Sequence, residues 1–190
     1  MTTSLLDVKR LEAGEMPLTR VECDLTDVAR TAIAPLVALV GENRLILESA
    51  PASVLARCDL GIICRVIANL VSNALKFAPD KSEVRIIVVK DGRYARLSVS
   101  VSGPGIPREF HAKVFEKFAQ VMGRATEHST GLGLTFCKLA IESHGGTIGV
   151  KSEAGGGSIF WFFLPCPLGK DHDPPVYESA KQSVASIEDE

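Results

Sequence analysis

Apolar and polar residues follow two periods along this 190-residue chain, and the two periods predict helices and strands. Apolar residues recur every three or four positions, the spacing of an amphipathic helix, in five segments: 5–11, 23–43, 59–79, 108–120 and 131–143. Apolar runs or strict alternation predict five strands: residues 44–51, two strands within 82–102, 146–153 and 157–165. The pattern therefore predicts one domain of mixed helices and strands.

Cap, turn and loop residues mark the ends of these elements. Asp24 is suited to cap the helix over 23–43, in which Pro35 predicts a kink. Asp91-Gly92 is a strong β-hairpin signal between the two strands of 82–102. The polar segment 121–131 predicts a mobile loop, and the proline-rich, acidic segment 166–190 predicts a disordered tail.

Composition narrows the classes of function. The net charge is −2 and the 21 Lys and Arg residues are dispersed, so the sequence predicts neither a nucleic-acid partner nor direct membrane contact. The five cysteines form no C-x-x-C pair, which argues against structural zinc and favours buried thiols in a reducing cytosol. We see no signal peptide or apolar run of spanning length and expect a cytoplasmic location.

The helix over 59–79 carries the first candidate chemistry. Asn69, Asn73 and Lys76 stand at i, i+4 and i+7 and therefore share one face, opposite an apolar face. An asparagine carbonyl is a hard oxygen suited to Mg²⁺, and a lysine can meet phosphates as a point charge. The alternative is an ordinary solvated polar face, and this helix alone does not decide between the two.

Two glycine segments favour a phosphate site. SGPGIP places Gly103 and Gly105 directly after a strand, where missing side chains let the backbone approach a ligand. STGLGL places Gly131 and Gly133 where a loop becomes a helix, so free N–H groups and the positive helix end can hold a polyphosphate. Each segment alone is weak, because turns are rich in glycine, and the order of the two carries the signal.

Five segments follow one another in a specific order: the Asn-bearing helix, SGPGIP, VFEKF, TGLGL and the closing GSIF strand. This order resembles the catalytic ATP-binding domain of sensor histidine kinases. The family shares its fold with gyrase, mismatch-repair and heat-shock chaperone ATPases. The resemblance covers roughly residues 21–165. It implies an α+β fold: a two-layer α/β sandwich whose mixed, mainly antiparallel sheet has three helices on one face, with a mobile ATP lid over about 108–130. It also implies that residues 1–16 end a dimerisation helix and that 17–20 form a linker.

The resemblance implies ATP and Mg²⁺ as cofactors and gives each site residue a role. Asn73 would be the Mg²⁺ ligand, Asn69 and Lys76 would be catalytic and face the phosphates, and Phe77 would lie near the base. Phe115 and Phe118 would anchor the lid, and Lys117 and Arg124 would reach the phosphates. The implied nucleotide-binding residues are Asn69, Asn73, Lys76, Phe77, Val101, Gly103, Gly105, Ile106, Lys117, Phe118, Arg124, Thr130, Gly131, Leu132, Gly133 and Leu134.

Three departures from the family pattern matter. The family has an aspartate two residues before the first glycine of SGPGIP that binds the adenine amino group, and Val101 stands there. Ser129 replaces the usual first glycine of the phosphate loop. No histidine of the chain has the context of the family's phosphoacceptor. In hydrolytic relatives a glutamate replaces Asn69, and because an amide cannot act as a general base, the resemblance favours transfer over hydrolysis.

Three readings of function remain at this point. The first is a kinase domain that phosphorylates a histidine on a dimerisation domain of the same full-length kinase or of a partner, from which a response regulator takes the phosphoryl group. The second is a degenerate, pseudokinase-like docking module with weak or no nucleotide binding, which Val101 favours. The third, an anti-sigma-factor serine kinase, is disfavoured by the Leu-Glu-Ala-Gly helix end at 11–14.

Overall fold

A five-stranded sheet forms one layer of the domain in the computed structural model, which describes residues 5–40, 43–119 and 131–167. The strands lie in the order β2-β4-β5-β7-β6. Their bounds are β2 (Arg44–Ser49), β4 (Glu83–Asp91), β5 (Tyr94–Val101), β6 (Thr147–Glu153) and β7 (Gly157–Pro165). β2 pairs with β4 in parallel and the other neighbours pair antiparallel. The predicted mixed, mainly antiparallel sheet is confirmed.

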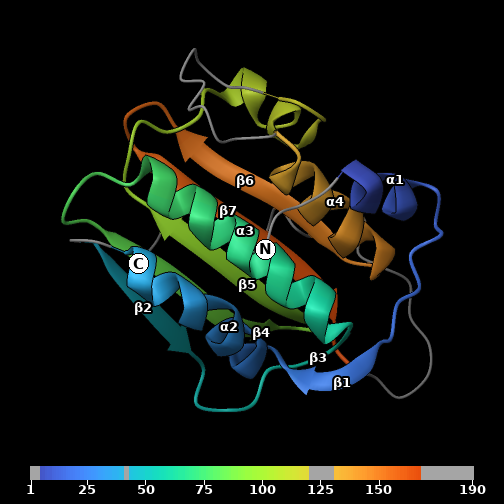
Figure 1. Cartoon of the computed structure of the whole chain (residues 1–190). Helices are drawn as coiled ribbons and strands as arrows, with labels where there is room; N and C mark the ends of the chain where they lie inside the picture. Colours follow the sequence, from blue (N-terminus) through green and yellow to red (C-terminus); the bar gives the residue numbers. More distant parts are fainter. Residues whose placement is uncertain (1–4, 41–42, 120–130, 168–190) are drawn as a thin grey trace.

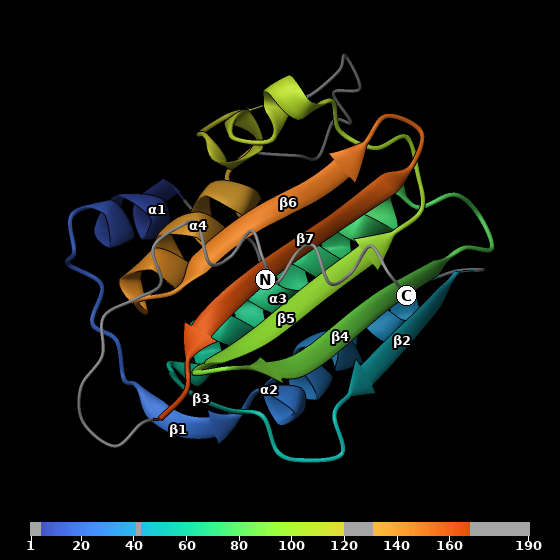
Figure 2. The same cartoon turned by 180° about the vertical axis from the view of Figure 1, so that it is seen from behind.

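Helices form the second layer. α2 (Leu25–Ile33), α3 (Leu60–Phe77) and α4 (Gly133–Ser143) lie on one face of the sheet (Figure 1), and the view from behind shows the sheet in front of them (Figure 2). The short helix α1 (Leu5–Glu12) packs beside α4 and buries Val8 and Leu11. The α+β architecture is confirmed.

The central helix α3 is stabilised both by a cap at its start and by burial of its apolar face. The Asp59 side chain caps it by accepting a hydrogen bond from the Ile62 N–H at 3.1 Å. Its apolar face, which includes Ile63, Ile67 and Leu70, is fully buried against the sheet. With 18 residues and a mean hydropathy of 1.4, α3 is long and apolar enough to cross a membrane, which corrects our expectation that no such run occurs. Its packing is that of a core helix.

Two short strands were not predicted. β1 (Val21–Asp24) and β3 (Leu55–Cys58) form a separate antiparallel pair, and each has only four residues. The helix predicted over 23–43 therefore begins only at Leu25, after β1, with Asp24 as its cap. At Pro35 the α-helix gives way to a 3₁₀ helix over Ala34–Leu39, as the missing N–H of proline requires.

The helix predicted over 108–120 is wrong for its described part. Residues 108–119 form two 3₁₀ turns, Arg108–Phe110 and Lys113–Phe115, and Glu116 is extended. Val114 and Phe115 are buried by packing against the rest of the domain, although they do not lie on an amphipathic helix. Most of the predicted loop 121–131, and the predicted tail from residue 168 on, lie outside the described residues.

Candidate functional site

One face of α3 is polar along its last two turns, and we call Asn69, Asn73 and Lys76 the amide face. Asn69 and Asn73 are half-buried and Lys76 is exposed. The Lys76 ammonium lies over the ring of Phe77, 5.3 Å from its centroid, while 45% of the Phe77 residue remains exposed. Two amides and one ammonium group therefore share one face of α3, as their spacing predicted.

The start of α4 meets this face. A Cβ built on Gly133, the first residue of α4, would lie 3.9 Å from Cγ of Asn69. α2 and α3 begin with aspartate side chains that accept hydrogen bonds from backbone N–H groups, whereas the residue before α4, Leu132, makes no side-chain cap hydrogen bond. The positive end of α4 therefore adjoins Asn69 on the amide face.

A buried thiol, Cys137, lies beside Asn69, and the sequence did not predict this neighbour. Cys137, on the inner face of α4, is fully buried, and its Sγ donates to the carbonyl oxygen of Val66 at 3.7 Å. Burial raises the pKa of the Cys137 thiol to about 12, although a hydrogen bond from the Asn69 side chain opposes this rise. The thiol is thus neutral at physiological pH and packs against Asn69 beneath the site.

The SGPGIP turn is held between α3 and the β6–β7 turn. A Cβ on Gly103 would lie 2.9 Å from the Phe77 carbonyl oxygen, and one on Gly105, whose φ is +70°, would lie 1.8 Å from the Glu153 carbonyl oxygen. The Ile106 N–H donates to the Ser152 hydroxyl at 2.7 Å, a contact not anticipated from the sequence. Both glycines are therefore required by close backbone packing, whatever ligand approaches them.

Val101 closes strand β5 at the edge of this site. It is half-buried, lies opposite Val84 of β4 and Ser158 of β7, and packs against the apolar core. The position two residues before Gly103 thus carries an apolar side chain continuous with the core. A valine side chain carries no hydrogen-bond donor or acceptor.

The VFEKF segment lies beside the start of α4. Phe115 is buried with its ring edge-on to Phe160, the centroids 6.4 Å apart. Phe118 is 61% exposed, has a φ of +60°, and its N–H donates to the Gly131 carbonyl at 3.1 Å. Gly131 must be glycine because its φ is +65° and a Cβ would lie 2.7 Å from Cα of Phe118.

Lys117 has a partner that the sequence did not suggest. Its ammonium lies 2.6 Å from the Glu12 carboxylate at the end of α1, an ion pair in which both side chains are more than a third exposed. A second pair joins α1 to α3, with Arg65 Nη2 2.7 Å from Asp7 Oδ2. Helix α1 is therefore tied to the domain at both sides of α4.

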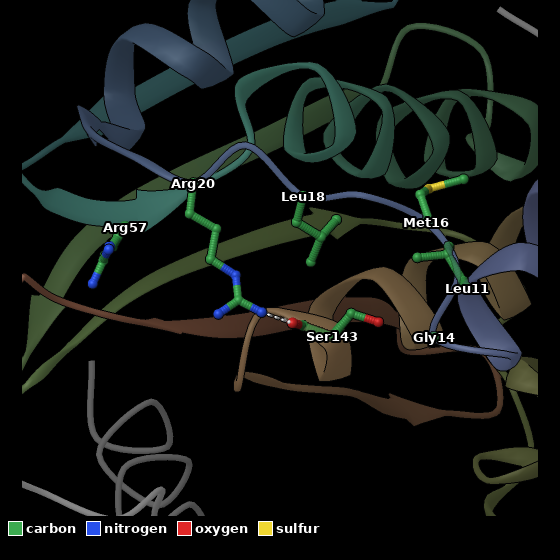
Figure 3. A pocket seen from close by; sticks show the side chains of 7 residues that line it. All are labelled: Leu11, Gly14, Met16, Leu18, Arg20, Arg57 and Ser143. Carbon is green, nitrogen blue, oxygen red and sulfur yellow. Dashed lines mark hydrogen bonds between the residues drawn. The ribbon is translucent and has the colours of Figure 1, made fainter.

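The structure thus brings Gly133 to Asn69 in the middle of α3, and Gly103 to Phe77 at the end of the same helix. Leu132 is buried, and Ile106 and Leu134 are half-buried beside the same elements. Arg124 and Thr130 lie outside the described residues. A hollow of about 590 Å³ lies elsewhere, between α1, the segment after it and the end of α4 (Figure 3).

Comparison with known proteins identifies the class. The family described as histidine kinase-, DNA gyrase B-, and HSP90-like ATPase matches residues 58–168. The chain belongs to this family, and within it the chain is a catalytic ATPase domain of the sensor histidine kinase type. Sensor histidine kinase TmoS of Ectopseudomonas mendocina is 34% identical over 166 residues, which cover 85% of this chain and 17% of TmoS.

Solved structures agree with this assignment. The catalytic domain of histidine kinase ThkA is 27% identical with a TM-score of 0.69, over 80% of this chain and 97% of that one. Full-length ShkA, solved in complex with AMPPNP, is 26% identical with a TM-score of 0.73, over 88% of this chain and 35% of ShkA. ThkA was also crystallised in complex with the response regulator protein TrrA. The chain spans 13–28% of the length of three curated relatives that it matches.

Proposed function

We propose that this domain binds Mg²⁺ and ATP at the amide face of α3 and transfers the γ-phosphoryl group to a histidine outside this chain. The observation that supports the proposal best is the approach of Gly133 to Asn69, with 3.9 Å between the Cβ position of one and Cγ of the other. It supports a site where the N-terminus of α4 meets Asn69, with Asn73 and Lys76 further along the same face of α3. In the transfer, the bond between the β-γ bridging oxygen and the γ-phosphorus breaks, a nitrogen–phosphorus bond forms, and ADP leaves.

The phosphates are proposed to lie between α3 and the start of α4. Free N–H groups and the dipole of α4 favour an anion at that point, and Lys76 adds a positive charge from α3. Gly131, Leu132, Gly133 and Leu134 would place their backbone along the phosphates. Lys117, Arg124 and Thr130 belong to the same proposal, as parts of a mobile lid over about 108–130, with Phe115 and Phe118 as its anchors.

The donor set fits a magnesium ion that is shared with ATP. Asn73 offers one hard carbonyl oxygen, half-buried on the side of α3 that carries Asn69 and Lys76. Mg²⁺ usually keeps several waters and takes one or two protein oxygens plus phosphate oxygens, so a single amide suffices. Bound there, the ion would neutralise charge on the phosphates.

Asn69 directs the chemistry toward transfer. An amide has no basic lone pair that can take a proton from water, so this side chain can orient a ligand and cannot serve as a general base. We therefore propose that a protein histidine accepts the phosphoryl group, as a nucleophile that needs no base at Asn69.

The acceptor and later partners would come from outside the described domain. We propose that residues 1–16 end a dimerisation helix that carries the acceptor histidine further upstream, that 17–20 are the linker, and that 21–165 are the ATP-binding domain. A response regulator is proposed as the next acceptor, since ThkA was crystallised with one. A cytoplasmic location of the domain is part of this proposal.

Val101 supports a second candidate, a docking module that binds nucleotide weakly or not at all. With an apolar side chain at this half-buried position, the site lacks the carboxylate that reads adenine in the family. A hydrogen bond to a charged group contributes roughly 1.5–3 kcal/mol, so its absence would weaken binding about ten- to a hundredfold. The glycines and amides that hold phosphate and metal are retained, which favours the kinase.

A phosphotransfer assay distinguishes these functions. The chain would be extended by the upstream helices of its own gene, and incubated with Mg²⁺ and ATP labelled at the γ-phosphate. The proposal predicts protein-bound label that is lost in acid and kept in base, the behaviour of a nitrogen–phosphorus bond. Label stable in acid would indicate a serine kinase, and no label while the protein stays folded would indicate the docking module.

A further inference from the structure

Three of the five cysteines gather where the linker enters the domain. Cys23 lies on β1, Cys58 on β3 and Cys64 in the second turn of α3. The Sγ atoms of Cys23 and Cys58 are 3.0 Å apart, and both thiols are free. Among the described residues no group of three or more His, Cys, Asp or Glu side chains is arranged to hold a metal ion. The cluster therefore calls for an explanation other than metal binding.

The pairing of β1 with β3 brings the two thiols together. Cys23 lies opposite Ala56 and Cys58 opposite Val21, so the cysteines are diagonal neighbours on one face of the pair. A disulfide bond is about 2.05 Å long, so the sulfurs need to approach by only about 1 Å. The third thiol, Cys64, has a partner of its own, since its Sγ donates to the Val28 carbonyl of α2 at 3.6 Å.

We propose that Cys23 and Cys58 form a reversible disulfide when the domain meets a low-molecular-weight disulfide such as oxidised glutathione. The half-buried Cys23 meets the oxidant first, because Cys58 is fully buried. The Cys23 thiolate attacks one glutathione sulfur, forms a mixed disulfide and releases one glutathione thiolate. Cys58 then attacks Cys23 Sγ, and its proton leaves with the second glutathione. Two protein thiols are oxidised and one glutathione disulfide is reduced to two thiols.

The order of these two steps agrees with the surroundings of each thiol. Burial, and then the hydrogen bond with Cys23, raise the pKa of the Cys58 thiol above its usual range. Cys58 is therefore protonated when the oxidant arrives, and it gives up its proton as it attacks the Cys23 sulfur, with which it is already in contact. Disulfides of intracellular proteins are usually transient and redox-sensing, which fits a pair of this kind.

The bridge would lie directly after the segment that joins α1 to β1. Between α1 and β1 the chain passes over a hollow of about 590 Å³, lined by Leu11, Met16, Leu18 and others (Figure 3). Its hydrogen bonds to the domain include the Thr19 N–H to Asp59 Oδ2 at 2.9 Å and the Arg20 guanidinium to the Ser143 carbonyl. A covalent bond at Cys23, directly after this segment, would restrain movement of the linker, a consequence that rests on the proposed function.

Peptide mapping tests the bridge itself. The full chain would be treated with oxidised glutathione, alkylated in denaturant and cut before aspartate, which leaves the three cysteines in separate peptides 7–23, 27–58 and 59–79. We expect peptides 7–23 and 27–58 to be joined, and to separate after reduction. A lasting glutathione adduct on Cys23 alone, a bond to peptide 59–79, or a bond between two chains would overturn the proposal.

Matched variants complete the test, and its main readout, the melting temperature, needs no nucleotide. The oxidised parent should melt about 5–10 °C higher than the reduced protein, since the bond closes a loop of about 35 residues. Cys64→Ser should keep this shift, and Cys23→Ser should lose it. The Mg²⁺·ATP affinity should stay within about twofold, because Asn73 lies about 20 Å from Asp59 along α3. An unchanged or lower melting temperature of the oxidised parent contradicts the proposal, whether or not the domain binds ATP.

Discussion

The Cβ position of Gly133, at the first residue of α4, lies 3.9 Å from Cγ of Asn69 on α3. This distance is an ordinary van der Waals contact, so an alanine fits there in the ligand-free protein. We expect Gly133→Ala to melt within about 2 °C of the parent, because alanine is a good helix residue. We expect its ATP affinity to fall at least about tenfold, because the methyl group occupies the approach of the phosphates. Thermal denaturation and calorimetric titration measure the two effects.

Gly131→Ala provides the matched contrast. At Gly131 the φ of +65° and the 2.7 Å from a Cβ to Phe118 Cα make any side chain strained. This variant should lose about 1–3 kcal/mol of stability. If Gly133→Ala binds ATP as the parent does, the phosphates do not lie where the proposal puts them.

Val101→Asp tests whether the missing carboxylate sets nucleotide affinity. The variant should bind ATP about tenfold or more tightly than the parent and GTP no better, because guanine has a carbonyl where adenine has an amino group. It should also be less stable when empty, since the side chain lies half-buried against the core. Calorimetric titrations with both nucleotides measure this. Equal ATP affinity of parent and variant would show that another group already reads the base, and the docking-module interpretation would lose its main support.

The ion pair of Lys117 with Glu12 predicts competition with the nucleotide. If Lys117 must leave Glu12 to reach the phosphates, Glu12→Gln should raise the ATP affinity. The gain should be about two- to fivefold, because an ion pair this exposed contributes at most about 1 kcal/mol. Lys117→Gln should lower the affinity in either background. An ATP affinity that Lys117→Gln leaves unchanged would remove Lys117 from the site.

His144 makes stability depend on pH. It is buried between α4 and α3, with Nδ1 2.7 Å from the Ala140 carbonyl and Nε2 accepting from the Asp59 N–H at 3.0 Å. Burial lowers the pKa of His144, and the nearby positive charge of Arg20 lowers it further. Protonation of Nε2 would break the hydrogen bond from the Asp59 N–H, because a protonated ring nitrogen is a donor and cannot accept. The unfolded chain takes up the proton near pH 6.5. The stabilisation is therefore complete above about pH 6.5 and is lost as the pH falls toward the folded pKa.

Urea denaturation at pH 7.5 and 5.5 measures the pH dependence of stability that we assign to His144. The free energy of unfolding should fall by up to about 1.4 kcal/mol per pH unit below pH 6.5 in the parent. His111→Gln should keep this dependence and His144→Gln should lose it, from a lower starting stability. A parent whose stability is flat over this range would contradict the assigned hydrogen bonds.

The strong patterns in the sequence predicted most of the fold. The five strands and the helix α3 follow from long apolar faces with clear ends, such as the Asp91-Gly92 turn between β4 and β5. The pair β1–β3 was missed because four residues such as Leu55–Cys58 are too short for a period to be seen. The helix predicted at 108–120 failed because burial of Val114 and Phe115 by distant elements decides the local structure.

Within the candidate site, the sequence predicted which residues share the face of α3 and where the glycines stand. It did not predict the contacts made across the fold. Lys117 and Glu12 are 105 positions apart, and Cys137 approaches Asn69 only because α3 and α4 pack side by side. A local sequence pattern cannot predict contacts between residues so far apart in the chain, because they depend on how the helices are arranged on the sheet.

The central claim is that the amide face of α3 holds Mg²⁺ and ATP, and Asn73→Ala tests it most directly. Calorimetric titration of Mg²⁺·ATP would compare the parent, Asn73→Ala and the matched control Ser72→Ala, an exposed neighbour on the same helix turn. The account predicts that the parent and Ser72→Ala bind alike, and that Asn73→Ala keeps its melting temperature within about 2 °C while losing Mg²⁺-dependent binding. Binding of Mg²⁺·ATP by Asn73→Ala with the affinity of the parent would contradict it.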